Sequence, residues 1–389
     1  MYQFDIPRAR TGTSSIKWDR YKSKFDTERT LIPLWIADTD FRAPQEVIEA
    51  IRRRADHGIF GYTFAMDDYL DTVCAWFQRR HKLQVEQEWV APTYGVVTAL
   101  RFTIEALTQP GEKVLIFTPA YEPFFEIIRN TGRACVEQQL SILEGRYQID
   151  FNQMEDHLKQ GVKLLIFCNP HNPVGRVWTH DELEQVATLC AKYGVFLASD
   201  EIHGDIELFG HRYISMAAFE EVRDLTAVYT SAGKSFSMTG LCASNLIIPN
   251  EALRNRIMDH IREAWIMSPN LFGLVATKAA YEYGEKWLNE ELTYLEENSC
   301  FVRSYLQAYM PEVTVAQHEG TFLMWLDFHK MHLTDQQLER KMVDVCSLGL
   351  GVGSHYGAEY GQFMRLNIGC ARTLLEEAMD HMRRLKYNS

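Results

Sequence analysis

Several features are scarce or missing in the 389-residue sequence, and each absence excludes a class of protein. Basic residues are in the minority: 40 lysines and arginines stand against 52 aspartates and glutamates, a formal net charge of −12. Nonspecific binding to nucleic acid or to an anionic membrane depends on a basic surface, so we expect neither partner. No apolar run approaches transmembrane length, and the N-terminus lacks the basic patch and apolar stretch of a signal peptide.

Paired cysteines are also missing. The eight cysteines are scattered without any C-x-x-C pair, and several lie in apolar runs. This distribution is typical of reduced thiols in a cytoplasmic protein. Metal-ligand spacing is absent too: Glu201, His203 and Asp205 alternate, but no second histidine follows at ligand spacing, so we expect no metal.

Short apolar strands alternate with helices through the first two thirds of the chain. Continuous apolar runs separated by helices are typical of a parallel sheet that is covered on both faces, so we predict an α/β fold with a mainly parallel sheet. The expected strands are 113–118, 163–168, 195–199 and 226–230, and the expected helices include 69–81, 95–107 and 181–193.

The last third has a different pattern. A long helical region at 253–307 leads into mixed elements, which predict a smaller α+β domain. Gly349–Gly353 superficially resembles a dinucleotide-binding loop but lacks the surrounding strand–turn–helix unit, so we interpret it as a flexible turn near the substrate entrance. The expected strands are 313–315, 321–328 and 363–368, and the expected helices are 335–348 and 373–385.

Polar side chains follow four of the predicted strands. Lys234 lies in the small-residue turn Ser231–Ser235, Asp200 directly follows the strand at 195–199, and Asn172 and Tyr121 follow two others. Taken alone, Lys234 would be interpreted as a solvated loop lysine, and Tyr121 as a core aromatic. Ligands of open α/β sheets gather at the carboxyl ends of the strands, so we expect these four side chains to meet there.

An amine, a carboxylate, an amide and an aromatic ring together are the groups needed to hold pyridoxal 5′-phosphate. Lys234 would form a Schiff base with the cofactor and later act as the catalytic base. Asp200 would pair with the ring nitrogen and keep it protonated, so that the ring can accept electrons. Asn172 would donate to the phenolic oxygen, and Tyr121 would lie on the ring face.

The cofactor phosphate needs donors of its own. A predicted helix opens at Gly95, Val96 and Val97, where unpaired backbone N–H groups and the helix dipole favour an anion. The hydroxyl of Ser231 adds a further polar group at the same edge of the sheet. We therefore predict that the phosphate binds at this helix start.

At this point the sequence resembles the aminotransferase class I/II family of fold-type I pyridoxal-phosphate enzymes along nearly its whole length. Within the family it is similar to the MalY/PatB branch of cystathionine β-lyases and cystalysins, which are carbon–sulfur lyases. The resemblance implies a large domain with a seven-stranded sheet and a smaller α+β domain, divided into an N-terminal segment 1–50 that joins the small domain, a large domain 51–282 and a small domain 283–389. The motifs that carry it are Trp35–Phe41, Phe60–Tyr62, Gly95–Val97, Asn169–Arg176, Asp200–His203 and Arg365–Gly369.

The resemblance implies roles for further residues. Tyr62 would reach the phosphate across the interface of a homodimer, so that each active site is built from two chains. Arg365 would bind the substrate α-carboxylate, for which a guanidinium fork is well suited. His203 would lie near the phenolic oxygen of the cofactor. The substrate pocket would be lined by Trp35, Ala37 and Asp38.

The chain departs from the family pattern at a few positions. Cys242 stands where many aminotransferases carry a phosphate-binding arginine, which is consistent with the lyase branch, whereas Thr39 and Gly233 replace the residues usual near the pocket. We predict β-elimination from a small sulfur amino acid such as L-cystathionine, L-cysteine or another cysteine S-conjugate, giving a thiol or sulfide, pyruvate and ammonia. The alternatives are an aminotransferase and a regulatory or partner-binding protein that retains the fold.

Overall fold

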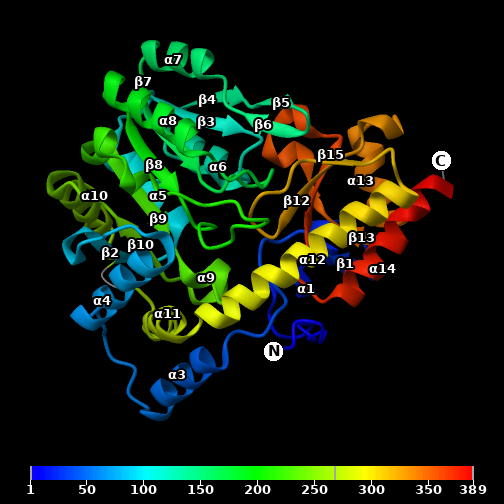
Figure 1. The fold of residues 1–389 in the computed structure, drawn as a ribbon, viewed down its shortest axis with the longest axis horizontal. Coiled ribbons are helices and arrows are strands. Elements are labelled where there is room, and N and C mark those ends of the chain that lie inside the picture. Colours follow the sequence, from blue (N-terminus) through cyan, green and yellow to red (C-terminus); the bar gives the residue numbers. More distant parts are fainter. Residues whose placement is uncertain (1, 267–268, 388–389) are drawn as a thin grey trace.

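Seven strands form the central sheet of the computed structural model, which describes residues 2–266 and 269–387 (Figure 1). β10 is antiparallel to both of its neighbours, and all other pairs are parallel, which confirms the predicted mainly parallel sheet. The order across the sheet is β2 (Val90–Thr93), β10 (Ser244–Ile247), β9 (Thr226–Thr230), β8 (Phe196–Asp200), β7 (Val162–Cys168), β3 (Lys113–Thr118) and β4 (Ala134–Gln139).

Helices cover both faces of this sheet because its central strands are apolar on both sides. Along β3, Val114 and Ile116 point into one core and Leu115 and Phe117 into the other, as the two-residue period of a strand requires. The first core is closed by α5 (Val96–Leu107), α6 (Glu122–Asn130) and α10 (Glu251–Glu263); the second includes α4 (Asp67–Trp76), α7 (Phe151–Lys159), α8 (His180–Tyr193) and α11 (Leu271–Tyr283).

A second, antiparallel sheet lies beside the C-terminal part of the long helix α12 (Glu285–Tyr309), which runs diagonally in yellow in Figure 1. Its strands are β11 (Thr314–Val315), β12 (Leu323–Asp327), β15 (Phe363–Asn367) and β14 (Gly351–Val352), and α13 (Asp335–Asp344) and α14 (Arg372–Met382) accompany it. The N-terminal part joins these elements through β1 (Ile32–Pro33), which pairs with β13 (Leu348–Gly349). The remaining helices are α1 (Ile16–Asp19), α2 (Tyr21–Lys24), α3 (Gln45–Asp56) and α9 (Ala232–Ser235).

Two sequence expectations are wrong near the C-terminus. The helix expected to reach residue 348 ends at Asp344, and the chain then enters β13. Gly349–Gly353 is not a flexible turn, because three of its residues belong to β13 and β14 and all five are buried. The glycines serve close packing: a Cβ on Gly349 would lie 2.8 Å from the ring of Phe25.

Apart from the short strands β1, β13 and β14, five strands have no prediction from the sequence. β2 and β10 are only four residues long, and β4 is a largely exposed edge strand, so none has a strong apolar pattern. The other two form a hairpin, β5 (Ser141–Leu143) with β6 (Arg146–Gln148). Among the described residues, none of the helices combines the length and apolar character needed to span a bilayer.

Candidate active site

A cavity of about 250 Å³ lies at the carboxyl ends of the strands β3, β7, β8 and β9. Ten of the predicted site residues line it, although they come from six separate stretches of the chain. They are Ala37, Gly95, Val96, Val97, Tyr121, Asn172, Asp200, His203, Ser231 and Lys234. The topology thus brings the predicted groups together at one edge of the sheet.

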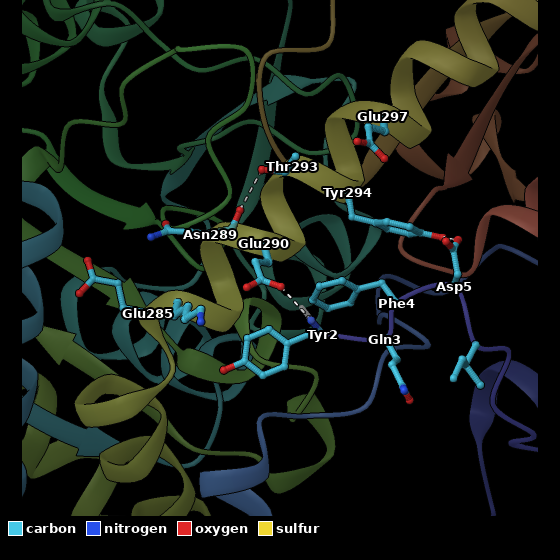
Figure 2. Close-up of a pocket in the computed structure, with 12 residues that line it drawn as sticks. Tyr2, Gln3, Phe4, Asp5, Glu285, Asn289, Glu290, Thr293, Tyr294 and Glu297 are labelled. Carbon is cyan, nitrogen blue, oxygen red and sulfur yellow. Dashed lines mark hydrogen bonds between the residues drawn. The ribbon is translucent and has the colours of Figure 1, made fainter.

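A larger cavity of about 1110 Å³ lies elsewhere, between the N-terminal segment and α12 (Figure 2). It contains aromatic and acidic side chains, and the amide of Tyr2 donates to Glu290 at 2.8 Å. None of the predicted site residues lines it. Convergent ionisable groups with shifted pKa values are a better sign of an active site than volume, so the strand-end cavity is the candidate.

Lys234 lies on the one-turn helix α9 immediately after β9. Ser231 begins this turn by accepting a hydrogen bond from the amide of Gly233 at 3.0 Å, and its own hydroxyl donates to the carbonyl of Ala243 at 2.6 Å. The amine of Lys234 donates to the carbonyl oxygen of Ala37. Burial, followed by the charge of Arg365, lowers the pKa of Lys234 to about 8, so a substantial fraction of the amine is neutral near physiological pH.

Buried side chains form hydrogen bonds that hold the Ser231–Ser235 turn in place. Ser235, next to the lysine, donates to Asp205 at 2.7 Å, and Asp205 also binds His81 at 2.9 Å and Trp76 at 3.0 Å. Through Asp205, these contacts connect α9 to Trp76 at the end of α4 and to His81 in the helical turn that follows it. They restrict the direction in which the lysine side chain leaves the backbone.

Asp200 ends β8 and is only 4% exposed. Burial raises the pKa of its carboxyl to about 7, because the single hydrogen bond from the amide of Ile202, at 3.2 Å, does not offset the loss of water. The neighbouring Glu201 is better satisfied: it accepts from Ser199, Ser215, Tyr213 and the amide of Met216. Glu201 is therefore held by four hydrogen bonds, whereas the Asp200 carboxylate accepts only one among the described residues.

Arg365 reaches the site from β15 in the second sheet. Its guanidinium donates to Asn172 Oδ1 at 3.1 Å and to the carbonyl of Trp35 at 2.7 Å, while its buried Nε has no hydrogen-bond partner in the described residues. The ring of Tyr356 lies 5.1 Å from the guanidinium carbon. A buried arginine with an unsatisfied donor is suited to an anionic ligand.

His203 and Tyr121 complete the walls. Burial, with the charges of Lys234 and Arg365, lowers the pKa of His203 well below its ordinary value, so the imidazole is neutral. Its Nδ1 has no partner within the part of the chain that the structure describes. Burial raises the pKa of Tyr121, so its phenol keeps its proton.

The start of α5 forms the remaining wall. Gly95 precedes the helix with φ of +95°, a conformation that side chains with a Cβ rarely adopt. No side chain caps this end, so the N–H groups of Val96 and Val97 face a cavity with no competing acceptor on the helix itself. Such a helix start fits a phosphate.

Some predicted residues lie outside the cavity lining. Trp35 contributes only its backbone carbonyl, through Arg365. The Asp38 carboxylate is held by Arg10 at 2.8 Å and lies 3.6 Å from Lys17, so it lines a neighbouring cavity instead. Tyr62 is fully exposed in the extended segment 57–66, between α3 and α4.

The structure adds residues that the sequence did not indicate. Tyr356 lies against Arg365, and Glu201 lies behind the cavity, but nothing in their spacing distinguishes them from core residues. Tyr94, Thr98, Cys168, Ile202, Thr239 and Ala243 also line the cavity, as do Gly233 and Cys242, which the sequence had already marked as departures from the family pattern. The whole donor set fits the predicted cofactor: a buried amine for an aldehyde, an unpaired carboxylate for a ring nitrogen and an open helix start for a phosphate.

Comparison with known proteins agrees with this geometry. Residues 29–382 match the family described as aminotransferase class I and II. The chain is 38% identical to cystathionine beta-lyase PatB of Bacillus subtilis (strain 168) over 98% of both chains, and 32% identical to protein MalY of Escherichia coli (strain K12) over 97% of both. The crystal structure of cystalysin from Treponema denticola, which contains pyridoxal 5′-phosphate, is 31% identical and superimposes with a TM-score of 0.96 over 100% of this chain and 99% of that one. The chain belongs to the aminotransferase class I and II family.

Proposed function

We propose that this protein is a pyridoxal-phosphate-dependent carbon–sulfur lyase. Its substrates would be small sulfur amino acids, such as L-cystathionine, L-cysteine or related cysteine S-conjugates, and its products a thiol or sulfide, pyruvate and ammonia. The observation that supports this most strongly is that Lys234 and Asp200 line one cavity, whose lining residue Asn172 accepts a hydrogen bond from Arg365. The similarity to a named cystathionine β-lyase over 98% of the chain supports the reaction type.

The cavity residues divide the binding of the cofactor among themselves. Lys234 would hold it covalently, and Asp200 would face the ring nitrogen, whose positive charge would relieve the cost of burying this carboxylate. When bound, the cofactor supplies an electron sink for charge that develops at the substrate α-carbon. Asn172 and His203 would bind near its phenolic oxygen, Tyr121 would cover its ring face, and Gly95, Val96, Val97 and Ser231 would bind its phosphate.

The chain's own residues then position the substrate and move its protons. Arg365 would bind the α-carboxylate, held in place by Asn172 and the carbonyl of Trp35. Lys234, with a pKa of about 8, can take the proton from the substrate α-carbon and return it to the sulfur as the carbon–sulfur bond breaks. Water completes the conversion of the remaining fragment to pyruvate and ammonia.

We also propose a homodimer in which each site receives Tyr62 from the partner. The segment around it exposes Ile59, Phe60, Phe64 and Met66 as well as Tyr62. A group of large apolar side chains exposed on a soluble chain usually marks an interface. Packing against a second copy would cover these side chains and could carry the tyrosine to a phosphate.

Two organisational proposals accompany this function. The division at 1–50, 51–282 and 283–389 is supported by the pairing of β1 with β13, which attaches the N-terminal segment to C-terminal elements. A cytoplasmic location is supported by the eight cysteines, all of which are free.

The second candidate is an aminotransferase, because that chemistry uses the same cavity groups and gives the family its name. Cys242 lines the cavity and stands where many aminotransferases carry a phosphate-binding arginine, which favours the lyase. A product assay separates the two. Purified holoenzyme incubated with L-cystathionine alone should release pyruvate, whereas keto-acid exchange that requires an added acceptor would identify a transaminase.

A further inference from the structure

A second cavity of about 470 Å³ adjoins the active site on the side of the N-terminal segment. Thr239 lines both cavities. The boundary between them is thin: Ala37 contacts the amine of Lys234, and the next residue, Asp38, already lines the second cavity. The second cavity therefore adjoins the space in which a substrate at Lys234 would lie.

Three arginines and two aspartates line the second cavity: Arg8, Arg10, Arg42, Asp38 and Asp40. The two aspartates are already neutralised. Arg10 binds Asp38 at 2.8 Å and Asp40 at 2.7 Å, and the fully buried amine of Lys17 binds Asp40 at 2.7 Å. These carboxylates consequently leave no net negative charge to offset the other two arginines.

Arg8 and Arg42 have neither an ion pair nor a hydrogen bond among the described residues, and both are exposed. Both also line a smaller adjoining cavity of about 240 Å³. Two guanidinium groups therefore lie at a hollow beside the candidate active site, although the chain has a net charge of −12. They create a local positive potential that favours an anion over a neutral group.

The wall between the two cavities is polar and built of small side chains. The hydroxyl of Thr39 contacts that of Ser237, and the hydroxyl of Thr239 donates to the carbonyl of Gly233 at 3.1 Å. A hydrated, anionic substituent can lie against such a wall at little desolvation cost, because hydroxyls can replace part of its water.

From this geometry we infer that the enzyme prefers cysteine S-conjugates whose sulfur substituent ends in a second carboxylate, and that Arg8 and Arg42 bind that carboxylate. This inference rests on the proposed lyase function and specifies its substrate class. Both arginines are specificity-determining residues in this account. They contribute to binding of the substituent and take no part in the proton transfers at Lys234.

Two nearly isosteric substrates test the inference: S-(2-carboxyethyl)-L-cysteine and its amide, S-(2-carbamoylethyl)-L-cysteine. Pyruvate release by the holoenzyme gives kcat and KM for each. For the wild type we expect kcat/KM to favour the carboxylate. In Arg42→Ala, Arg8→Ala and the double variant, KM for the carboxylate should rise by about three- to tenfold, in line with exposed charge pairs, with kcat unchanged.

The amide substrate should change by less than about twofold in the same variants, because an uncharged group loses little from removal of a partly exposed charge. Arg340→Ala is the matched control, since it removes an exposed arginine on α13 that does not line the cavity. The preference of the wild type should also weaken as salt is added. Equal kcat/KM for the two substrates in the wild type, or an equal loss for both in the arginine variants, would overturn the inference while leaving lyase activity intact. Absence of pyruvate from any conjugate would instead refute the proposed function.

Discussion

The strand-end cavity and the segment 57–66 contrast in how their functional residues are held. Lys234, Asp200 and Arg365 are fixed by contacts within one chain, and burial shifts the pKa values of Lys234 and Asp200. Tyr62 is fully exposed. One chain therefore brings together the groups of the candidate site, whereas the proposed role of Tyr62 requires a second chain.

The largest expected effect concerns Lys234, in the buried strand-end cavity. Lys234→Ala should lower pyruvate release from L-cystathionine by about 10³-fold or more, because it removes both the covalent attachment and the base. Lys234→Arg, which keeps a positive charge, should be equally inactive. Steady-state pyruvate assays measure both variants, and an undiminished rate in either would remove Lys234 from the mechanism.

Asp200→Asn should separate function from stability. We expect about a 10²-fold loss of elimination, since an amide cannot keep a ring nitrogen protonated. In the cofactor-free protein, the raised pKa of Asp200 means that the folded state binds its proton more tightly than the unfolded state. The native protein therefore loses stability as the pH rises from about 4 to about 7, and the loss persists above that range.

The variant lacks this titration. Thermal unfolding should show Asp200→Asn more stable than the wild type at pH 8, by up to about 4 kcal/mol, with the difference disappearing near pH 4. A difference that does not depend on pH would show that the carboxylate is not buried in its charged form.

Arg365 links the second sheet to the cavity, so its variants test whether that link binds substrate. Arg365→Ala should lower kcat/KM by about 10²-fold. Arg365→Lys should recover about tenfold of this loss, because it keeps the charge without the two-pronged geometry. The absorbance of the bound cofactor should stay unchanged in both variants. Loss of the cofactor would instead assign Arg365 to the framework of the cavity.

The smallest expected signal concerns Tyr62, the exposed residue in this comparison. Tyr62→Ala and Lys234→Ala chains, each of low activity, should regain activity when mixed dimers form. Random pairing makes half of the dimers mixed, and each mixed dimer has one complete site, so about a quarter of wild-type activity should return. Mass spectrometry verifies that mixed dimers are present. If they are present and activity does not return, Tyr62 contributes to the active site of its own chain or to neither active site.

Much of the fold and cavity could be predicted because strong local signals coincided. β3, β7 and β9 are continuous apolar runs, and the polar residue after each run falls at the same edge once the strands are parallel. Short or exposed strands such as β2, β4 and β10 could not be predicted, since they acquire order only from their neighbours in the sheet. The strand β13 was mistaken for the end of a helix for the same reason.

Contacts between distant segments could not be predicted from the sequence either. Neither the pairing of Asp38 with Arg10 and Lys17 nor the position of Tyr356 against Arg365 follows from any local pattern. The first contact places Asp38 in the neighbouring cavity, although the family resemblance implied a place in the substrate pocket. Such long-range ion pairs depend on how the N-terminal segment crosses the molecule.

One measurement tests the central claim, that the strand-end cavity is the catalytic site, most directly. The holoenzyme is reduced with borohydride, which fixes a covalently bound aldehyde cofactor to its lysine, and the digested protein is mapped by mass spectrometry. The account predicts a pyridoxyl phosphate group on the peptide that contains Lys234, with no other lysine modified in stoichiometric yield. A stoichiometric modification at any other lysine, with Lys234 unmodified, would contradict it.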